Sequence, residues 1–242
     1  MQLYGLIGYP LRHSFSAQYF AEKFKREEIS ARYENFEMER VDGLRDFVRE
    51  HPLLRGLNVT IPHKQAVIPL LDALSPEAEA IGAVNVIKVD NGRLIGHNTD
   101  VIGFVDSLRP LLEGRDVSEA LVLGTGGASK AVVHGLRKLG ILPQLVSRKP
   151  HEGVITYEDI DGGWMERARL IVNCSPVGMY PHIENAPAVP YELITPAHIL
   201  YDLVYNPLET KFLQLGREKG ALTCNGLEML HRQAEAAWRI FH

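Results

Sequence analysis

A glycine-rich turn near the middle of the chain places the strongest constraint on its fold. The stretch reads Ala120-Leu-Val-Leu-Gly124-Thr-Gly126-Gly127-Ala128-Ser129, with an apolar run before the turn and a helical pattern after it. This order directs backbone N–H groups and a helix N-terminus at a pyrophosphate. Gly124 permits the tight turn, Gly126 lets the backbone approach the phosphates, and Ser129 takes the third, small position. The sequence therefore predicts a dinucleotide-binding turn.

The context of the turn strengthens this interpretation, because glycine is also needed in strand-to-helix turns that bind nothing. After the turn, apolar side chains recur at helical spacing, and Gly140 stands where a C-cap belongs. Further apolar runs near 120–123, 143–147, 169–174, 199–205 and 221–224 alternate with helical patterns. That alternation predicts a doubly wound parallel sheet of the Rossmann type.

The end of the second predicted strand of this series indicates which dinucleotide binds. An NAD site places Asp or Glu about 20 residues after the turn, to bind the ribose hydroxyls. This chain instead reads Ser147-Arg148-Lys149. A guanidinium binds a 2′-phosphate and stacks on adenine, so these residues favour NADP (NADPH). The alternative is a solvated basic turn, but its distance from the glycine turn favours the cofactor.

The position of the turn divides the chain of 242 residues. A long segment precedes the turn, with strand-like and helical stretches at 3–8, 16–28, 32–37, 43–50 and 56–61 and a hairpin signal at Asp90-Asn91-Gly92. We therefore expect an α/β fold of two domains. A substrate-binding and catalytic domain spans residues 1–100, and an NADP-binding domain spans residues 101–225.

Composition and charge narrow the function classes. The chain is 45% hydrophobic and 23% charged, as in an ordinary globular protein. A formal charge of −4 does not favour binding to nucleic acid or to an acidic membrane surface. No apolar run approaches the ~20 residues of a membrane span. Cys174 and Cys224 lack metal-ligand spacing. We expect a cytoplasmic protein with buried, reduced thiols, no metal, and no nucleic-acid or membrane partner.

Two serines near the N-terminus form the first candidate binding element. Ser14-Phe-Ser16 precedes the first predicted helix. One serine is accounted for as an N-cap. Two hydroxyls on the same side of an extended backbone, next to a helix N-terminus, make a receptor for a carboxylate. The residues alone leave both interpretations open.

Lys64 is the second candidate. In Asn58-Val-Thr60-Ile-Pro62-His-Lys64 a strand ends and a proline is expected to set a first helical turn that contains the lysine. A cation is disfavoured at that end of a helix, and such violations of local rules are typical of functional sites.

Three further polar residues are candidates. Asp100 stands at a strand-to-helix junction, where it is either an N-cap or a site residue. Asn85 lies in an apolar strand and requires a partner, from the backbone or from a ligand. Gln233 follows Gly226 by seven residues, on the same face of the last predicted helix.

Taken together, these strings resemble the shikimate dehydrogenase family over essentially the full chain. The matching motifs are Ser14-x-Ser16, Asn58-Val-Thr-Ile-Pro-His-Lys64, Gly82-Ala-Val-Asn85, Asn98-Thr-Asp100, Gly124-Thr-Gly-Gly-Ala-Ser129, Asn173-Cys-Ser-Pro-Val-Gly178-Met, Tyr201-Asp-Leu-Val-Tyr205 and Gly226-Leu-Glu-Met-Leu-His-Arg-Gln233. The resemblance implies reversible, NADPH-dependent reduction of 3-dehydroshikimate to shikimate, on the route to chorismate and the aromatic amino acids.

The resemblance also implies residue roles. Ser14 and Ser16 would hold the substrate carboxylate, and Lys64 and Asp100 would form the catalytic pair, either of which could move the proton. The other substrate contacts would come from Thr60, Asn85, Tyr205 and Gln233. Cofactor contacts would come from the glycine turn (Gly124, Gly126, Gly127, Ala128, Ser129), from Ser147, Arg148 and Lys149, and from Leu203 and Gly226. Because Gln233 would meet substrate, we expect the last helix, residues 226–242, to return to the first domain.

The chain departs from the family in one motif. The family's cofactor selector is commonly Asn-Arg-Thr, whereas this chain has Ser147-Arg148-Lys149-Pro150, which keeps the arginine. The alternatives are an NAD-using quinate/shikimate dehydrogenase, a methylene-tetrahydrofolate dehydrogenase, and a non-catalytic, regulatory nucleotide-binding relative. The paired serines, the basic selector and the retained Lys64 and Asp100 argue against them. We expect a monomer or a homodimer.

Overall fold

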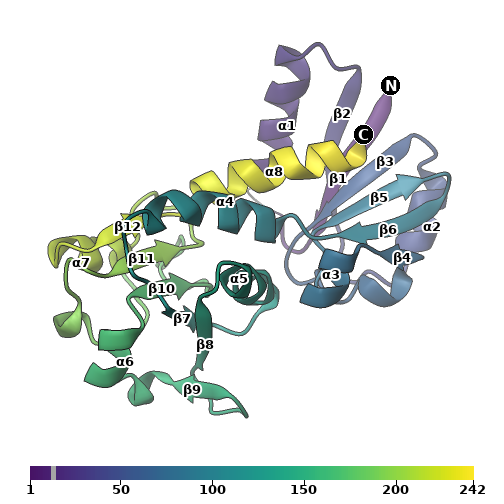
Figure 1. Ribbon diagram of the computed structural model, residues 1–242. Helices are drawn as coiled ribbons and strands as arrows, with labels where there is room; N and C mark the ends of the chain where they lie inside the picture. The colour runs from purple at the N-terminus through teal and green to yellow at the C-terminus, as the bar shows by residue number, and fades with distance from the viewer. Residues whose placement is uncertain (12–14) are drawn as a thin grey trace. The chain divides into compact units, whose positions relative to one another are not determined.

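The computed structural model describes residues 1–11 and 15–242. The chain divides into two compact units, each with its own six-stranded sheet (Figure 1). The first unit comprises Met1–Thr99 together with Ala234–His242, and the second comprises Asp100–Gln233. The first unit is therefore built from both ends of the chain.

The sheet of the first unit has the order β2-β1-β3-β5-β6-β4. Its strands are β1 (Gln2–Gly8), β2 (Ala31–Glu37), β3 (Leu54–Val59), β4 (Ala73–Leu74), β5 (Val86–Asp90) and β6 (Arg93–His97). β1 runs parallel to β2 and β3, whereas β5 is antiparallel to β3 and β6. As predicted, β5 and β6 form a hairpin, and the positive φ angles of Asn91 (49°) and Gly92 (82°) give it a type I′ turn.

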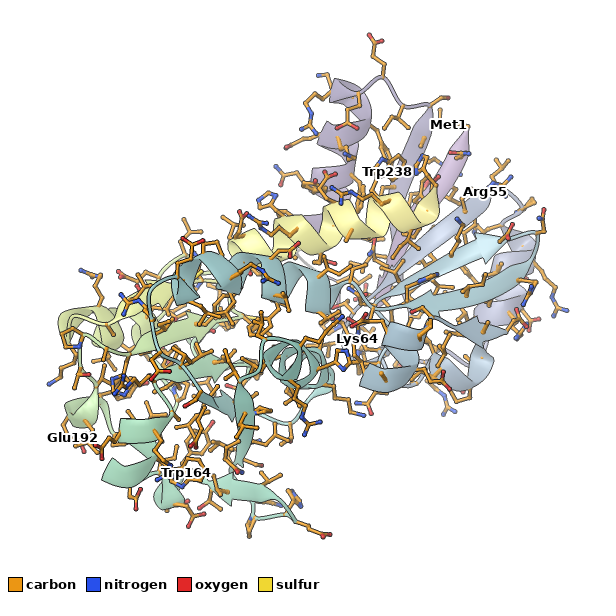
Figure 2. The ribbon with its side chains drawn as sticks, viewed as in Figure 1. Met1, Arg55, Lys64, Trp164, Glu192 and Trp238 are labelled. Atoms are coloured by element: carbon orange, nitrogen blue, oxygen red, sulfur yellow. The ribbon has the colours of Figure 1, made fainter. Side chains whose placement is uncertain are left out.

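Helices cover both faces of this sheet. One face carries α1 (Phe15–Arg26) and the C-terminal part of α8 (Leu227–Phe241), which share a core with Tyr4 and Val86. The other face carries α2 (Leu44–Glu50) and α3 (Pro76–Ile81). Figure 2 labels Trp238, which packs in the first of these two cores.

The C-terminal part of α8 is fixed in the first unit by close packing and by charge. A Cβ added to Gly56 on β3 would lie 2.2 Å from the ring of Phe241, so only glycine permits this contact. The buried ammonium of Lys23 on α1 donates to Glu235 at 3.0 Å. The predicted apolar stripe of the last helix is correct for Ala234, Trp238 and Phe241. It is wrong for Leu227 and Leu230, which are only partly buried. Met229 is buried instead, against the core of the second unit.

The second unit is a parallel doubly wound sheet, which confirms the predicted fold class. Its strands are β7 (Glu119–Leu123), β8 (Leu142–Ser147), β9 (Val154–Thr156), β10 (Leu170–Asn173), β11 (Ile199–Asp202) and β12 (Leu222–Cys224). The order β12-β11-β10-β7-β8-β9, parallel throughout, is the Rossmann arrangement. The order reverses between β7 and β10, where such sheets bind their ligands.

Helices cover both faces of this second sheet as well. α4 (Asp100–Leu112) and α5 (Gly127–Lys138) pack on one face, and α6 (Gly162–Arg167) and α7 (Lys211–Glu218) pack on the other. Both cysteines are free thiols. The residues as wholes are half-buried, and both pack against the core of the second unit, where burial raises the pKa of each thiol.

Two further findings concern the described residues as a whole. Within 1–11 and 15–242, no helix has both the length and the apolar character needed to cross a membrane. The same residues include no group of three or more His, Cys, Asp or Glu side chains arranged to hold a metal ion.

Candidate functional site

The glycine turn lies at the switch point of the second sheet. Gly124 directly follows β7 and has a φ of +110°, a conformation that L side chains rarely adopt. Its N–H donates to the carbonyl oxygen of Val146 on β8 at 2.9 Å. A Cβ at this position would lie 3.3 Å from the backbone nitrogen of Ser175, which follows β10. Conformation and packing therefore both favour glycine here.

Gly126 is glycine for a different reason. Its backbone is extended, with φ −78° and ψ −175°, so any residue could adopt it. An added Cβ would meet nothing within 4 Å, so the chain itself does not require glycine at this position. Helix α5 starts at the next residue and, among the described residues, receives no side-chain cap from its N-cap. Open space beside an uncapped helix N-terminus fits a pyrophosphate.

Ser129 stabilises the turn from inside α5. Its hydroxyl donates to the carbonyl oxygen of Gly126 at 2.6 Å, and the side chain is buried. The small third residue of the motif therefore ties the first turn of the helix to the loop before it. Gly127 and Ala128 complete the same first turn of α5.

The basic selector lies on the strand next to the glycine turn. β7 and β8 are paired in parallel, with Leu123 opposite Val146, so Ser147 and Gly124 stand at the same edge of the sheet. Arg148 and Lys149 follow β8 and are exposed, and the Lys149 N–H donates to the Ser147 hydroxyl at 3.4 Å. Burial raises the pKa of Tyr157, and the charge of nearby Arg148 opposes that rise. The arrangement offers two cations to a 2′-phosphate.

Three other candidates gather at one edge of the first unit's sheet. The Thr60 N–H donates to Ile7 at 2.9 Å, at the end of β1. The carbonyl of Lys64 accepts the N–H of Val84 at 2.7 Å, and the carbonyl of Asn85 accepts the N–H of Val59 at 2.8 Å. The segment 60–64 is therefore joined to the segment 84–85. Figure 2 shows Lys64 and Arg55 at opposite ends of this sheet.

The predicted helical turn around Lys64 is wrong. The segment 61–67 is a series of turns, and the next helical element is the 3-10 helix η1 (Ile68–Leu70). The prolines at 62 and 69 supply no N–H, which limits any helical ladder between them. Lys64 therefore does not stand at the N-terminus of a helix, and no unfavourable helix dipole acts on it. The buried ring of His63 anchors this segment instead, because its Nε2 lies 2.6 Å from the carbonyl oxygen of Met38.

Ser16 lies inside α1, so it is not the N-cap of that helix, whereas the residue before the helix is Ser14. Its side chain is hydrogen-bonded to the hydroxyl of Tyr33, which donates to Oδ1 of Asn58 at 2.8 Å. Burial raises the pKa of Tyr33. This chain of contacts connects Ser16 to β3, two residues before Thr60. Ser14, the other predicted carboxylate ligand, lies outside the described residues.

Asn85 has the partner that its burial demands. Its Oδ1 accepts the N–H of Thr99 at 2.7 Å, and its Nδ2 donates to the Thr99 hydroxyl at 2.9 Å. Asp100 follows Thr99 directly and begins α4. The structure thus satisfies the Asn85 amide from within the first unit.

Four further candidates, Leu203, Tyr205, Gly226 and Gln233, also belong to the second unit. A Cβ added to Gly226 would lie 2.1 Å from the carbonyl oxygen of Leu203, and the Gly226 N–H donates to Val204 at 3.1 Å. Glycine at this position therefore permits two backbones to touch. Burial raises the pKa of Tyr205. Gln233 is buried on α8, and a Cβ added to Gly103 of α4 would lie 3.0 Å from its Cβ.

One buried polar cluster beside these residues was not predicted. Asn173 ends β10, Asp202 ends β11, and Nδ2 of Asn173 donates to Oδ1 of Asp202 at 2.9 Å. The Thr210 hydroxyl donates to Oδ2 of Asp202 at 2.6 Å. The sequence does contain a feature that points to this cluster. Asp202 is an acid at the end of a buried apolar strand, at the edge where such sheets bind ligands.

Comparison with known proteins adds independent findings. Residues 6–87 match the family model described as the shikimate dehydrogenase substrate binding domain. A curated relative from Syntrophomonas wolfei, named shikimate dehydrogenase (NADP(+)), is 40% identical, over 99% of this chain and 89% of its own.

Two solved structures are similar to this chain over nearly its full length. Shikimate 5-dehydrogenase from Thermus thermophilus, in complex with NADP(H) and shikimate, has a TM-score of 0.88 and 34% identity, covering 100% of this chain and 93% of its own. Quinate dehydrogenase from Corynebacterium glutamicum, in complex with NAD, has a TM-score of 0.88 and 30% identity, covering 99% and 93%.

Proposed function

The chain belongs to the shikimate dehydrogenase family, and we propose that its reaction is the reversible reduction of 3-dehydroshikimate to shikimate with NADPH. The observation that carries the choice of cofactor is the pair Arg148 and Lys149, exposed at the end of β8 beside the glycine turn. Two cations at that position suit the 2′-phosphate of NADP. The alternative function is that of a quinate dehydrogenase that uses NAD.

We assign the two halves of the reaction to the two units. The first unit supplies most of the substrate contacts, since it contains residues 6–87, which match the substrate-binding family model. The second unit binds NADPH, since it has the Rossmann strand order and the glycine turn at its switch point.

Three groups of residues in the second unit would hold the cofactor. The glycine turn and the start of α5 would bind the phosphates, through Gly124, Gly126, Gly127, Ala128 and Ser129. Ser147, Arg148 and Lys149 would bind the 2′-phosphate end, and Leu203 and Gly226 would contact the nicotinamide half. When bound, NADPH supplies the hydride.

The substrate is recognised through its carboxylate and its ring hydroxyls. Ser14 and Ser16 bind the carboxylate. The hydrogen bonds from Ser16 to Tyr33 and from Tyr33 to Asn58 support this role, because they hold Ser16 near β3. The hydroxyls are bound by Thr60, Asn85, Tyr205 and Gln233. The hydrogen bonds that join Val59 to Asn85 and Lys64 to Val84 support a shared location for Thr60, Asn85 and Lys64.

Lys64 and Asp100 complete the chemistry. Reduction of a ketone requires a proton for the oxygen that develops negative charge. A lysine ammonium already carries a proton at neutral pH, so Lys64 acts as general acid in the reductive direction. Asp100 orients the ammonium and accepts a hydrogen bond from the substrate hydroxyl. In the reverse direction, oxidation of shikimate requires the neutral amine of Lys64 to accept the proton.

One assay tests the proposed activity. The purified chain is mixed with NADPH or NADH and with 3-dehydroshikimate, 3-dehydroquinate or no substrate, and nicotinamide absorbance is followed. We expect rapid oxidation of NADPH with 3-dehydroshikimate only. Faster oxidation of NADH with 3-dehydroquinate would replace our proposal with a quinate dehydrogenase, and no oxidation with either would indicate a binding protein.

Two finer points stay predictions. We expect a monomer or a homodimer, which sedimentation of the purified chain measures, and a location in the cytoplasm, which cell fractionation measures.

A further inference from the structure

Asp202 is a buried carboxylate that the proposed chemistry does not use. It ends β11, fully buried, and three donors converge on it. Oδ1 accepts Nδ2 of Asn173 at 2.9 Å and the N–H of Val204 at 3.0 Å, and Oδ2 accepts the Thr210 hydroxyl at 2.6 Å. All three contacts are donated to the carboxylate, as suits its ionised form, since protonation of Oδ2 would require the Thr210 hydroxyl to become an acceptor.

The donors around Asp202 come from segments beside the predicted cofactor contacts. Asn173 also accepts the N–H and the hydroxyl of Ser175, at 3.0 and 2.6 Å. The backbone nitrogen of Ser175 lies 3.3 Å from where a Cβ of Gly124 would be. The Asn173–Asp202 pair therefore ties the loop that packs against the glycine turn to the end of β11.

The second connection runs from Asp202 toward the nicotinamide contacts. The Val204 N–H is held by the carboxylate, and the Val204 carbonyl in turn accepts the N–H of Gly226. The carbonyl of Leu203 lies in the space that a Gly226 side chain would fill. The backbone from 203 to 205 is thus fixed from both sides, by Asp202 and by Gly226.

We propose that Asp202, in its ionised form, is a positioning residue that holds the Leu203–Tyr205 backbone in the geometry that binds the nicotinamide half of the cofactor. This inference rests on the proposed function, because Leu203 and Gly226 are the residues assigned there to the nicotinamide half and Tyr205 is assigned to the substrate. Asp202 itself touches neither cofactor nor substrate and acts through Val204.

The ionisation of Asp202 falls in an accessible range of pH. Burial raises the pKa of Asp202 to about 6, against the three hydrogen bonds that lower it. The titratable groups facing it are the Cys174 thiol, after β10, and the Tyr191 hydroxyl, in η3 (Tyr191–Leu193). The pKa values of both groups are raised, so both are neutral when Asp202 titrates.

The raised pKa of Asp202 means that its ionised form does not stabilise the fold, so a role in positioning can be measured apart from stability. Because the folded-state pKa lies above the ordinary value for Asp, this group favours folding most at low pH. That contribution is lost as the pH rises through about 6. The ionised carboxylate is therefore retained at neutral pH at the expense of stability. Replacing Asp202 with asparagine should leave the thermal midpoint at pH 8 no lower than in the wild type.

The test compares Asp202→Asn with the wild type in two binding measurements that need no turnover. One ligand is NADPH, and the other is 2′,5′-ADP, which keeps the adenine half and the 2′-phosphate but lacks nicotinamide. At pH 8 we expect about tenfold weaker binding of NADPH and unchanged binding of 2′,5′-ADP. Glu166→Gln removes an exposed charge from the same unit and should change neither.

The pH dependence supplies the second readout. The ratio of wild-type to Asp202→Asn affinity for NADPH should approach one below pH 5 and rise through pH 6 to its plateau, since other titrations cancel in the ratio. A ratio that stays flat, or equal losses for NADPH and 2′,5′-ADP, overturns the proposal.

A paired substitution at Thr210 covers the case in which Asp202→Asn fails to fold. Thr210→Ser keeps the hydroxyl that donates to Asp202, and Thr210→Val removes it. We expect only the valine variant to weaken NADPH binding, and equal behaviour of the two variants overturns the inference. A wild type that binds NADPH but reduces no substrate would instead contradict the proposed function and leave the binding comparison intact.

Discussion

Asn85 and Thr99 are joined by reciprocal hydrogen bonds inside the first unit: the Thr99 N–H donates to Asn85 Oδ1 at 2.7 Å, and Asn85 Nδ2 donates to the Thr99 hydroxyl at 2.9 Å. Both residues are buried, and Asp100 is the next residue in the chain. Asn85 therefore fixes the backbone from which the proposed catalytic carboxylate extends.

Replacing Asn85 with alanine should destabilise the protein. The buried N–H of Thr99 would lose its acceptor, which costs about 1–3 kcal/mol in free energy of unfolding. Urea denaturation measures this loss. Thr99→Val serves as the control, because it keeps the N–H and removes only the hydroxyl. If Thr99→Val proves as damaging as Asn85→Ala, the backbone bond is not the stabilising one.

Replacing Lys64 with methionine should abolish proton transfer while the fold survives. The backbone carbonyl of Lys64, which accepts the Val84 N–H, is unchanged by the substitution. We expect kcat for 3-dehydroshikimate reduction to fall by ~10²–10⁴ with a modest change in KM. Steady-state kinetics of Lys64→Met and Asp100→Asn, measured in parallel, show which of the two residues transfers the proton. Near-normal kcat with a raised KM would make Lys64 a binding residue and assign the proton to Asp100 or water.

Replacing Arg148 with alanine should discriminate between the two nicotinamide cofactors. Arg148 is exposed, so the fold does not depend on it. The variant loses a charge-assisted contact to the 2′-phosphate, about 1.5–3 kcal/mol, which only NADPH carries. KM for NADPH should rise far more than KM for NADH. Equal rises for both cofactors would show that Arg148 does not recognise the 2′-phosphate.

Two glycines should respond to alanine in opposite ways. Gly126→Ala adds a Cβ to open space at the N-cap of α5, so the free energy of unfolding should fall by no more than about 1 kcal/mol, the cost of a poorer cap, while NADPH binding weakens strongly. Gly226→Ala places a Cβ 2.1 Å from the carbonyl oxygen of Leu203, so stability itself should fall. Thermal unfolding and NADPH titration of both variants measure these effects. A larger loss of stability in Gly126→Ala would mean that the chain, and not a ligand, requires that glycine.

The sequence was most informative where one residue type has one physical use. Asn91 and Gly92 adopt positive φ, and the hairpin that they predicted is present. Gly124 likewise has the positive φ that its turn required. These conformations depend on the local backbone, so a single sequence reveals them.

Predictions failed where distant residues decide the local structure. The segment before Lys64 follows a strand and begins with a proline, as many helices do, yet it forms turns anchored by His63 to Met38. Asp202 stood within a quoted motif, but its importance depends on Asn173, 29 residues earlier, and on Thr210, which lies outside that motif. Helix α3 was also missed, although Ser75 before Pro76 is a start signal, because the helix has only six residues.

The core that Phe241 and Trp238 form with Tyr4 and Phe24 has a consequence for synthesis on the ribosome. The first unit needs residues 234–242, which are translated after the second unit, whereas the second unit is one uninterrupted stretch from Asp100 to Gln233. Residues 1–99 therefore wait for residues 234–242, and the second unit has its full set of partners before the first unit does. This reverses the usual order in which the more N-terminal domain folds first during translation. A message truncated after the codon for Gln233 would leave a complete second unit joined to a first unit that lacks part of its own interior.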